Sequence, residues 1–571
     1  MEEKVIELNE LKIVDTPARY IGGESRQVIK NVNMVTNRVA LAVPTMYEMG
    51  MFDFDFKKLY YTLNNRKDTW CERVFAPFID FENLLRNTDN KLYTLESKTI
   101  LRNMDVVIFS IPSELMYTNV LNMLNLGGIP CLSSRRKEGF PLIIATGSAV
   151  LNPRPMEEFI DLFIIGEPNK VINEIMDVYK ITKESFNVSK IDMLQSMRNI
   201  PGVYIPSVMD ETESVYMVEE SLETEQPIKS IVIPSIPTGF DKTIVTLSKG
   251  CSRNCTMCPH KYVYGKPEYM STDKGVLKTK RLMDTTGNTD VMLMTNCYAD
   301  YSGFPEIIYR LNDLDRPKVK RVYFMETKLN KDNLWILKYL DVTGDYPSII
   351  VGAPTEELRE KVGIDIDEDE VLMVAREIFN TGFDKVRLKY ILGIPGENYE
   401  DFQRMFDLAD KVCDIYKEVY AKSPDKYIVE INLYNFTARP HTPTQWCAVN
   451  NVETIEIKIK YIMGRNKNQN VVISTEDGRQ TVISTLLARG GTEVGQVIYE
   501  AWKEGAKFDM LPGVFDIENW QVALNKTGVE IKKYLEEQND KLLLPWDNIK
   551  VNTSTEELRR IYINKFRSIK Q

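Results

Sequence analysis

The stretch LSKGCSRNCTMCPHKYVYGKPEYMS, residues 247–271, places three cysteines in the spacing C-x3-C-x2-C. Cys251, Cys255 and Cys258 directly follow an apolar run that is typical of a buried β-strand. Three thiolates on one short loop can bind three irons of a cubane iron–sulfur cluster and leave the fourth iron open for another ligand. A cluster used only for electron transfer would take a fourth cysteine. The sequence therefore predicts an open metal site at the end of a strand.

A zinc site and a set of structural thiols are the alternatives for these cysteines. Structural zinc almost always takes four ligands, so His260 would have to serve only two residues after Cys258, a spacing outside the common zinc patterns. Iron is therefore the favoured metal. The other cysteines are scattered singly and form no disulfide framework: Cys71, Cys131, Cys297, Cys413 and Cys447.

Strand-like apolar runs continue after the cysteines and alternate with helical segments. The runs are TIVTLSKG (243–250), VMLMTN (291–296), VKRVYFME (319–326), SIIVGAP (348–354), KVRLKYILGIPGE (385–397) and YIVEINLYNF (427–436). Strands that alternate with helices form a parallel sheet. We expect residues 241–447 to form a partial (β/α)6 TIM-type barrel, whose chemistry lies at the carboxyl ends of its strands.

A second α/β region precedes the barrel. Its apolar runs lie at 39–43, 105–111, 141–147 and 162–166, and its helical patterns lie at 56–65, 117–128 and 171–181. We expect residues 39–180 to form a Rossmann-type, doubly wound parallel sheet. The rest divides into a lead-in (1–38), an acidic, proline-containing linker (181–240) and a mostly helical C-terminal accessory domain (448–571).

Charge and hydropathy narrow the function classes. The chain has 571 residues and a formal net charge of −10, with acidic and basic residues interleaved, so no basic stripe indicates tight non-specific nucleic-acid binding. The start, MEEKVIELNELKIVD, lacks the basic and apolar parts of a signal peptide. No run reaches the roughly 18 apolar residues of a membrane span. We expect a cytoplasmic protein without membrane contact.

The cysteine spacing after a strand resembles that of the radical S-adenosylmethionine (SAM) superfamily. The resemblance implies a [4Fe-4S] cluster on Cys251, Cys255 and Cys258, with SAM chelated by its unique iron. It also implies an enzyme that cleaves SAM with one electron to make a 5′-deoxyadenosyl radical. A low-potential donor, flavodoxin or ferredoxin, would supply that electron.

Three further segments resemble the SAM-binding face of this superfamily. They are TNCYADY (295–301), APTEELR (353–359) and LKYILGIPGEN (388–398). The resemblance implies contacts to the SAM amino group, to its ribose and carboxylate, and to its adenine, in that order. The implied contact residues are Asn296, Tyr298, Asp300, Glu357, Arg359, Gly393, Ile394 and Gly396. APTEELR also reads as a helix start with solvated charges, and the glycines also suit an ordinary turn.

A doubly wound domain before such a barrel resembles the cobalamin-dependent subgroup. More closely, the chain resembles a largely uncharacterised group of radical SAM proteins with an N-terminal cobalamin-binding-like domain, through segments such as VALAVPTMYEMGM (39–51), FTARPHTPTQW (436–446) and LLARGGTEVGQVIYEAWKEGAKFD (486–509). The cobalt-ligand motif D-x-H-x-x-G is absent, because the two histidines, His260 and His441, lie outside the N-terminal domain. Cobalamin would have to bind without a protein histidine.

Three functions follow from these patterns. The first is cobalamin-dependent methylation of an unactivated carbon, and the second is a cobalamin-free radical SAM reaction such as thiolation, rearrangement, or RNA or peptide modification. The third is a non-catalytic iron–sulfur or zinc protein. In the turn RPHTPTQW, we interpret His441 as a structural turn residue in preference to a polar contact or a proton carrier. Arg439 either binds a substrate carboxylate or phosphate or pairs with a local acid. The substrate stays open between a small molecule, a peptide and RNA.

Overall fold

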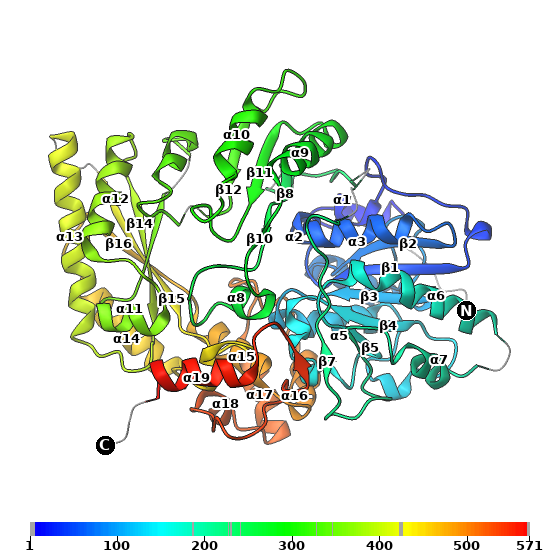
Figure 1. Cartoon of the computed structure of the whole chain (residues 1–571). Helices are drawn as coiled ribbons and strands as arrows, with labels where there is room; N and C mark the ends of the chain where they lie inside the picture. The colour runs from blue at the N-terminus through cyan, green and yellow to red at the C-terminus, as the bar shows by residue number, and fades with distance from the viewer. Residues whose placement is uncertain are drawn as a thin grey trace.

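In the computed structural model, the described residues are 6–185, 188–225, 228, 231–239, 241–326, 328–344, 347–421 and 426–567. The N-terminal part is a six-stranded sheet in the order β2-β1-β3-β4-β5-β6, parallel except for β6 (Figure 1). The strands are β1 (Asn37–Val43), β2 (Thr69–Phe75), β3 (Val106–Ser110), β4 (Leu142–Thr146), β5 (Leu162–Ile164) and β6 (Val203–Tyr204). The chain reverses direction across the sheet between β1 and β3, the place where doubly wound sheets bind ligands.

Helices cover both faces of this sheet, which confirms the doubly wound fold. Alternate residues of β1 face opposite ways: Leu41 packs with α3 (Phe54–Asn64) and α6 (Ile172–Glu184), whereas Ala42 packs with α4 (Ile79–Thr88) and α5 (Tyr117–Leu126). Side chains alternate between faces in a strand, so each face has its own hydrophobic core.

Strand β2 was not predicted, because charged residues interrupt its apolar pattern. Arg73 lies inside the strand with 1% of its side chain exposed, and it pairs with Glu24 at 2.8 Å and Glu96 at 2.7 Å. The guanidinium also lies over the Tyr60 ring, 5.4 Å from its centroid. Because the charges are paired and hydrogen-bonded, this fully buried edge strand can carry them. Glu24 also ties the N-terminal lead-in to the sheet.

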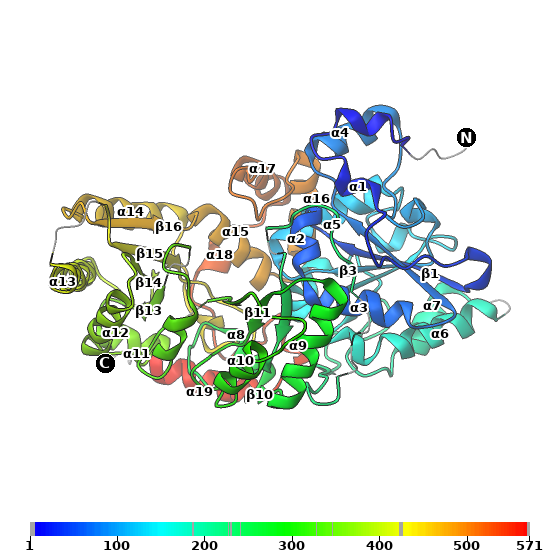
Figure 2. The ribbon, with the colours of Figure 1, turned by 90° about the horizontal axis from the view of Figure 1, so that it is seen from above.

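The barrel strands lie in two parallel sheets that share one hydrophobic core. One sheet has the order β12-β11-β8 and the other the order β13-β14-β15-β16 (Figures 1 and 2). The strands are β8 (Thr243–Thr246), β11 (Asp290–Met294), β12 (Arg321–Phe324), β13 (Ser348–Gly352), β14 (Val386–Leu392), β15 (Val429–Asn435) and β16 (Val471–Thr475). Within the described ranges, no ladder joins β12 to β13. The expected six strands are present, and β16 adds one more beyond residue 447.

Helices of the barrel lie outside its strands. They are α9 (Thr272–Thr286), α10 (Phe304–Asn312), α11 (Glu356–Val362), α12 (Glu368–Asn380) and α13 (Asp401–Tyr420). Apolar residues on their inner faces, such as Ile307 and Val374, join the barrel core. This arrangement matches the expected TIM-type architecture.

The C-terminal region is mostly helical and returns to the N-terminal sheet. Its helices are α14 (Val452–Arg465), α15 (Gly478–Arg489), α16 (Glu493–Glu504), α17 (Ile517–Thr527), α18 (Lys532–Leu535) and α19 (Thr555–Lys565). Ile483 and Val497 share a core with Leu121 of α5, and Thr118 donates its hydroxyl to Asp509 at 2.6 Å. The short strand β17 (Ile549–Lys550) pairs with β7 (Val215–Tyr216) in the linker. The domain limits drawn from the sequence stay predictions.

Searched over the same described residues, the helices include none that is both long and apolar enough to cross a membrane.

Candidate cluster and cofactor site

The cysteine loop is an excursion between two paired short strands. Strand β9 (Ser248–Lys249) precedes the thiols, and β10 (Glu268–Tyr269) pairs with it in the antiparallel sense. Gly250 has a φ of 64°, and a Cβ there would lie 2.5 Å from the Lys266 carbonyl oxygen, so this position requires glycine. Cys258 directly precedes α8 (Pro259–Tyr264), which leads the chain back towards β10. The loop therefore begins and ends at fixed points.

The loop rests on the C-terminal end of α11. The amide of Thr256 donates to the Val362 carbonyl at 3.0 Å. Gly363, with a φ of 70°, follows the helix, and a Cβ there would lie 2.0 Å from the Asn254 carbonyl oxygen. Only glycine allows this approach. The sequence analysis did not single out Gly363, because its contact with the cysteine loop forms only in the folded chain.

The three thiols are free and half-buried. Burial raises the pKa of the Cys255 thiol to about 11, and the nearby Cys258 and Cys251 add to this rise. Lys328 and Arg253 oppose it with their positive charges. A cubane takes one thiolate on each of three irons, and three free cysteines on one loop are a donor set of that kind.

The segment after β11 bonds directly to the cysteine loop. Asn296 donates its side-chain amide to the Gly250 carbonyl at 2.7 Å. Asp300 accepts from the Ser252 hydroxyl and, at 2.8 Å, from Nη2 of Arg253. Cys297, which the sequence treats as a scattered cysteine, lies with its Sγ 3.4 Å from Nε of Arg253. Asn296 and Asp300 thus lie at the loop.

Tyr298 has a different place from its two neighbours. Its ring is buried between Phe304 and Phe324, at centroid distances of 5.1 and 5.2 Å. Its hydroxyl donates to the Leu293 carbonyl at 2.9 Å and accepts from the Met325 amide at 3.0 Å. A buried phenol with both bonds satisfied is a core residue. We therefore leave Tyr298 out of the cofactor contacts.

Helix α11 carries the two charged residues expected near SAM. Glu357 is 79% exposed and pairs with Lys361 at 3.0 Å, as a solvated helix charge does. Arg359 donates Nη1 to the Ala353 carbonyl at 3.3 Å, but its buried Nε has no hydrogen-bond partner. The buried hydroxyl of Tyr390 on β14 also has no hydrogen-bond partner. Burial raises the pKa of this hydroxyl, and the positive charge of Arg359 opposes the rise. Polar atoms left unpaired in a native protein call for an explanation, and a bound ligand supplies one.

Two glycines and a buried carboxylate define the turn after β14. Gly393 and Gly396 have φ values of 93° and 91°, and the Gly393 amide donates to the Glu397 carboxylate at 3.0 Å. Glu397 in turn pairs with Lys458 at 2.8 Å, with its side chain fully buried. Ile394 is 2% exposed and packs in a local apolar cluster. Glu397 and Lys458 were not predicted, because they are close only in the folded chain.

The segment RPHTPTQW joins the barrel to the N-terminal sheet. Arg439 pairs with Glu114, which follows β3, at 2.9 Å. Nε2 of His441 lies 3.0 Å from the Leu151 carbonyl, and burial lowers the pKa of this imidazole to about 4. His441 is therefore neutral near pH 7 and has the structural role that the sequence favours. Of the two alternatives for Arg439, the structure shows the pair with a local acid, Glu114.

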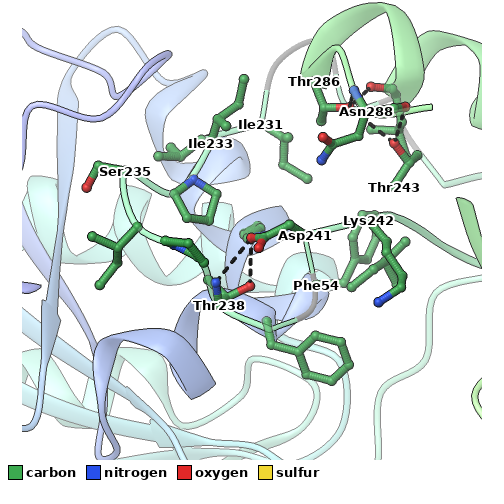
Figure 3. A pocket seen from close by; sticks show the side chains of 18 residues that line it. Phe54, Ile231, Ile233, Ser235, Thr238, Asp241, Lys242, Thr243, Thr286 and Asn288 are labelled. Atoms are coloured by element: carbon green, nitrogen blue, oxygen red, sulfur yellow. Dashed lines mark hydrogen bonds between the residues drawn. The ribbon is translucent and has the colours of Figure 1, made fainter. Parts of the chain in front are cut away.

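A pocket of about 280 Å³ lies elsewhere, next to the amino end of β8 (Figure 3). Thr243 and Thr286 lie on one side of it, and Thr238 donates its hydroxyl to Asp241 on the other side at 3.0 Å. The chemistry expected of a parallel barrel belongs to the opposite, carboxyl end of its strands. This pocket is therefore separate from the cysteine loop.

Two family models match the chain. Residues 245–409, which include the cysteine loop, match the model described as the radical SAM superfamily, and residues 55–206 match the model of radical SAM proteins, N-terminal. An uncharacterised protein of Methanocaldococcus jannaschii is 24% identical and covers 72% of this chain and 84% of its own length. A tRNA-2-methylthio-N(6)-dimethylallyladenosine synthase of Hydrogenobaculum sp. is 21% identical, over 55% of this chain and 70% of that protein.

Solved structures with some likeness include two radical SAM enzymes. They are TsrM from Kitasatospora setae with cobalamin and a [4Fe-4S] cluster (TM-score 0.44, 12% identity, 72% of this chain and 77% of that one) and OxsB with aqua-cobalamin (TM-score 0.43, 12% identity, 93% and 79%). The cysteine loop at a strand end and the two family matches agree. The chain belongs to the radical SAM superfamily, and this family implies a [4Fe-4S] cluster and SAM.

Proposed function

We propose that this enzyme holds a [4Fe-4S] cluster on Cys251, Cys255 and Cys258 and reductively cleaves SAM to a 5′-deoxyadenosyl radical. The observation that carries the proposal is the set of three free thiols on one loop that rests on Gly363 at the carboxyl end of the strands. When bound, the cluster supplies one electron to SAM. The chain's own residues bind SAM, orient it and exclude quenchers.

The segments after β11, β13 and β14 each supply a part of the SAM site in this proposal. Asp300 accepts hydrogen bonds from the amino group of SAM, and Asn296 keeps the loop in place through Gly250. Arg359 donates its unpaired Nε to the carboxylate or ribose. Gly393, Ile394 and Gly396 form a rigid wall for the adenine. Glu357 lies in solvent, paired with Lys361, and does not contact SAM in this proposal.

A more specific proposal is cobalamin-dependent methylation of an unactivated carbon. The sheet order β2-β1-β3 supports it, because it creates a ligand site at the carboxyl ends of β1 and β3. A histidine-ligated corrinoid does not fit this edge, since neither His260 nor His441 belongs to the sheet. Asn119 connects the C-terminal region to the end of β1. Its side-chain amide donates to the Pro44 carbonyl at 2.9 Å, and its side-chain oxygen accepts from the Phe508 amide at 2.9 Å.

The alternative is a cobalamin-free reaction: thiolation, rearrangement, or RNA or peptide modification. The relative whose name refers to tRNA methylthiolation favours RNA among these substrates. The chain has no second trio of closely spaced cysteines for an auxiliary cluster, which argues against methylthiolation itself. In either case we propose a cytoplasmic enzyme with flavodoxin or ferredoxin as electron donor, and the eight free thiols suit that reducing compartment.

Anaerobic reconstitution tests the proposal. Iron, sulfide and cobalt are measured first, and 5′-deoxyadenosine is then measured after dithionite is added with SAM. About four irons per chain and 5′-deoxyadenosine support the proposal. Stoichiometric cobalt with corrinoid absorbance separates the cobalamin-dependent reaction from the alternative. A reconstituted protein with zinc alone and no SAM cleavage contradicts it.

A further inference from the structure

Arg253 links the cysteine loop to the segment after β11. It lies between Cys251 and Cys255, and its Nη2 donates to Oδ1 of Asp300 at 2.8 Å. The adjacent Ser252 donates its hydroxyl to Oδ2 of the same carboxylate. Both oxygens of Asp300 are therefore bonded by the loop that carries the thiols. A short, charge-assisted bond of this kind fixes geometry more strongly than a neutral one.

The Arg253–Asp300 pair is partly shielded from water. The side chains of Arg253 and Asp300 are 38% and 20% exposed. Water therefore screens their attraction less than it screens that of a fully exposed ion pair. A carboxylate has roughly four lone-pair positions. Arg253, Ser252 and the Cys297 thiol occupy about three of these positions, so about one remains for a further donor. An ammonium group is a compact cation with three donors, and it suits this acceptor.

We propose that Arg253 is a positioning residue for SAM: with Ser252 it orients the Asp300 carboxylate toward the amino group of SAM bound at the open iron. This inference rests on the proposed function. It explains why a bulky, charged residue lies inside the cysteine motif. Nε of Arg253 also holds the Cys297 thiol at 3.4 Å, so the loop, the acid and this thiol form one connected unit.

The test measures SAM binding separately from cluster assembly. Arg253→Met, Arg253→Lys and Asp300→Asn are reconstituted beside the wild type, and iron content, the SAM dissociation constant and the EPR change on SAM addition are recorded. We expect wild-type iron in all three. The dissociation constant should rise about tenfold or more in Arg253→Met and Asp300→Asn, and less in Arg253→Lys, which retains a charge.

Arg376→Met is the matched control, because Arg376 forms a comparable pair with Glu418 at 2.6 Å on outer helices. It should leave the dissociation constant unchanged. A wild-type dissociation constant and EPR change in Arg253→Met would overturn the inference. Loss of iron in both Arg253 variants would also overturn it, because Arg253 would then act on cluster assembly. A wild-type protein that binds no SAM would instead contradict the proposed function.

Discussion

The carbonyl oxygen of Asn254 lies only 2.0 Å from the place that a Cβ on Gly363 would occupy. The backbones of the cysteine loop and of the end of α11 are thus in direct contact, with no room for a side chain between them. This contact makes the geometry of the thiols depend on a residue more than a hundred positions away in the chain.

Replacing Gly363 with alanine should displace the cysteine loop, because the backbone oxygen of Asn254 cannot move aside as a flexible side chain would. Iron content after reconstitution should fall several-fold. Gly528→Ala is the control, since Gly528 has the same φ of 70° but open space around it. That control should lose only about 1–2 kcal/mol of stability from the left-handed backbone. Equal iron in both variants would show that the contact is unimportant.

Replacing Arg73 with methionine should destabilise the N-terminal sheet. It leaves Glu24 and Glu96 buried without their partner, each with 1% or less of its side chain exposed. Removal of one partner of a buried ion pair costs about 3–5 kcal/mol. Thermal unfolding followed by calorimetry should show a clearly lower Tm. Arg310→Met, which breaks an exposed pair with Asp273, should change the Tm little. An unchanged Tm for Arg73→Met would be inconsistent with the buried network.

Acid should weaken the fold through His441. Burial lowers the pKa of its imidazole from 6.5 to about 4, so the unfolded chain binds the proton first as the pH falls. Stability from this group is therefore full above pH 6.5 and is lost between pH 6.5 and 4, by at most about 3 kcal/mol. His441→Asn is the test variant, because asparagine tolerates the left-handed backbone at this position, where φ is 57°. The Tm difference between wild type and variant should shrink as the pH falls, and a constant difference would refute this role.

The C-terminal segment should stabilise the helix that follows the thiols. Asn552 donates to the Val263 carbonyl at 2.9 Å, and the Thr553 amide donates to the Tyr262 carbonyl at 3.0 Å. Asn552→Ala removes about 1 kcal/mol of hydrogen bonding from α8. Hydrogen exchange of residues 259–264 should become faster, while exchange in α13 should not change. Unaltered protection of α8 would contradict this link between the chain's end and the cysteine loop.

The sequence allowed most of the sheet strands to be predicted, because their buried residues form continuous apolar runs, as in β3, β4 and β14. Strand β2 could not be found this way, since Arg73 is buried through partners from distant segments. Strand β16 was missed because VVIST has only three apolar residues, and of its five residues only Val471 is buried. Apolar patterns report burial, and they do not report which charges will be paired.

The site was predictable only in part for a similar reason. The cysteine motif is local, so Cys251, Cys255 and Cys258 stand out in the sequence. The residues that hold it come from other elements: Gly363 from the end of α11 and Asp300 from the segment after β11. Tyr298 shows the opposite case, because its neighbours Asn296 and Asp300 lie at the loop while its own ring enters the core. Side chains at successive positions after a strand face different ways, and only the fold separates them.

The central claim is that three thiols of one loop carry the cluster that cleaves SAM. The most direct measurement compares Cys255→Ala with Cys413→Ala, a buried cysteine on α13 away from the loop, after anaerobic reconstitution. We predict that Cys255→Ala loses both the cluster absorbance and the dithionite-driven release of 5′-deoxyadenosine, while Cys413→Ala keeps both. Persistence of the cluster or of SAM cleavage in Cys255→Ala would contradict the assignment.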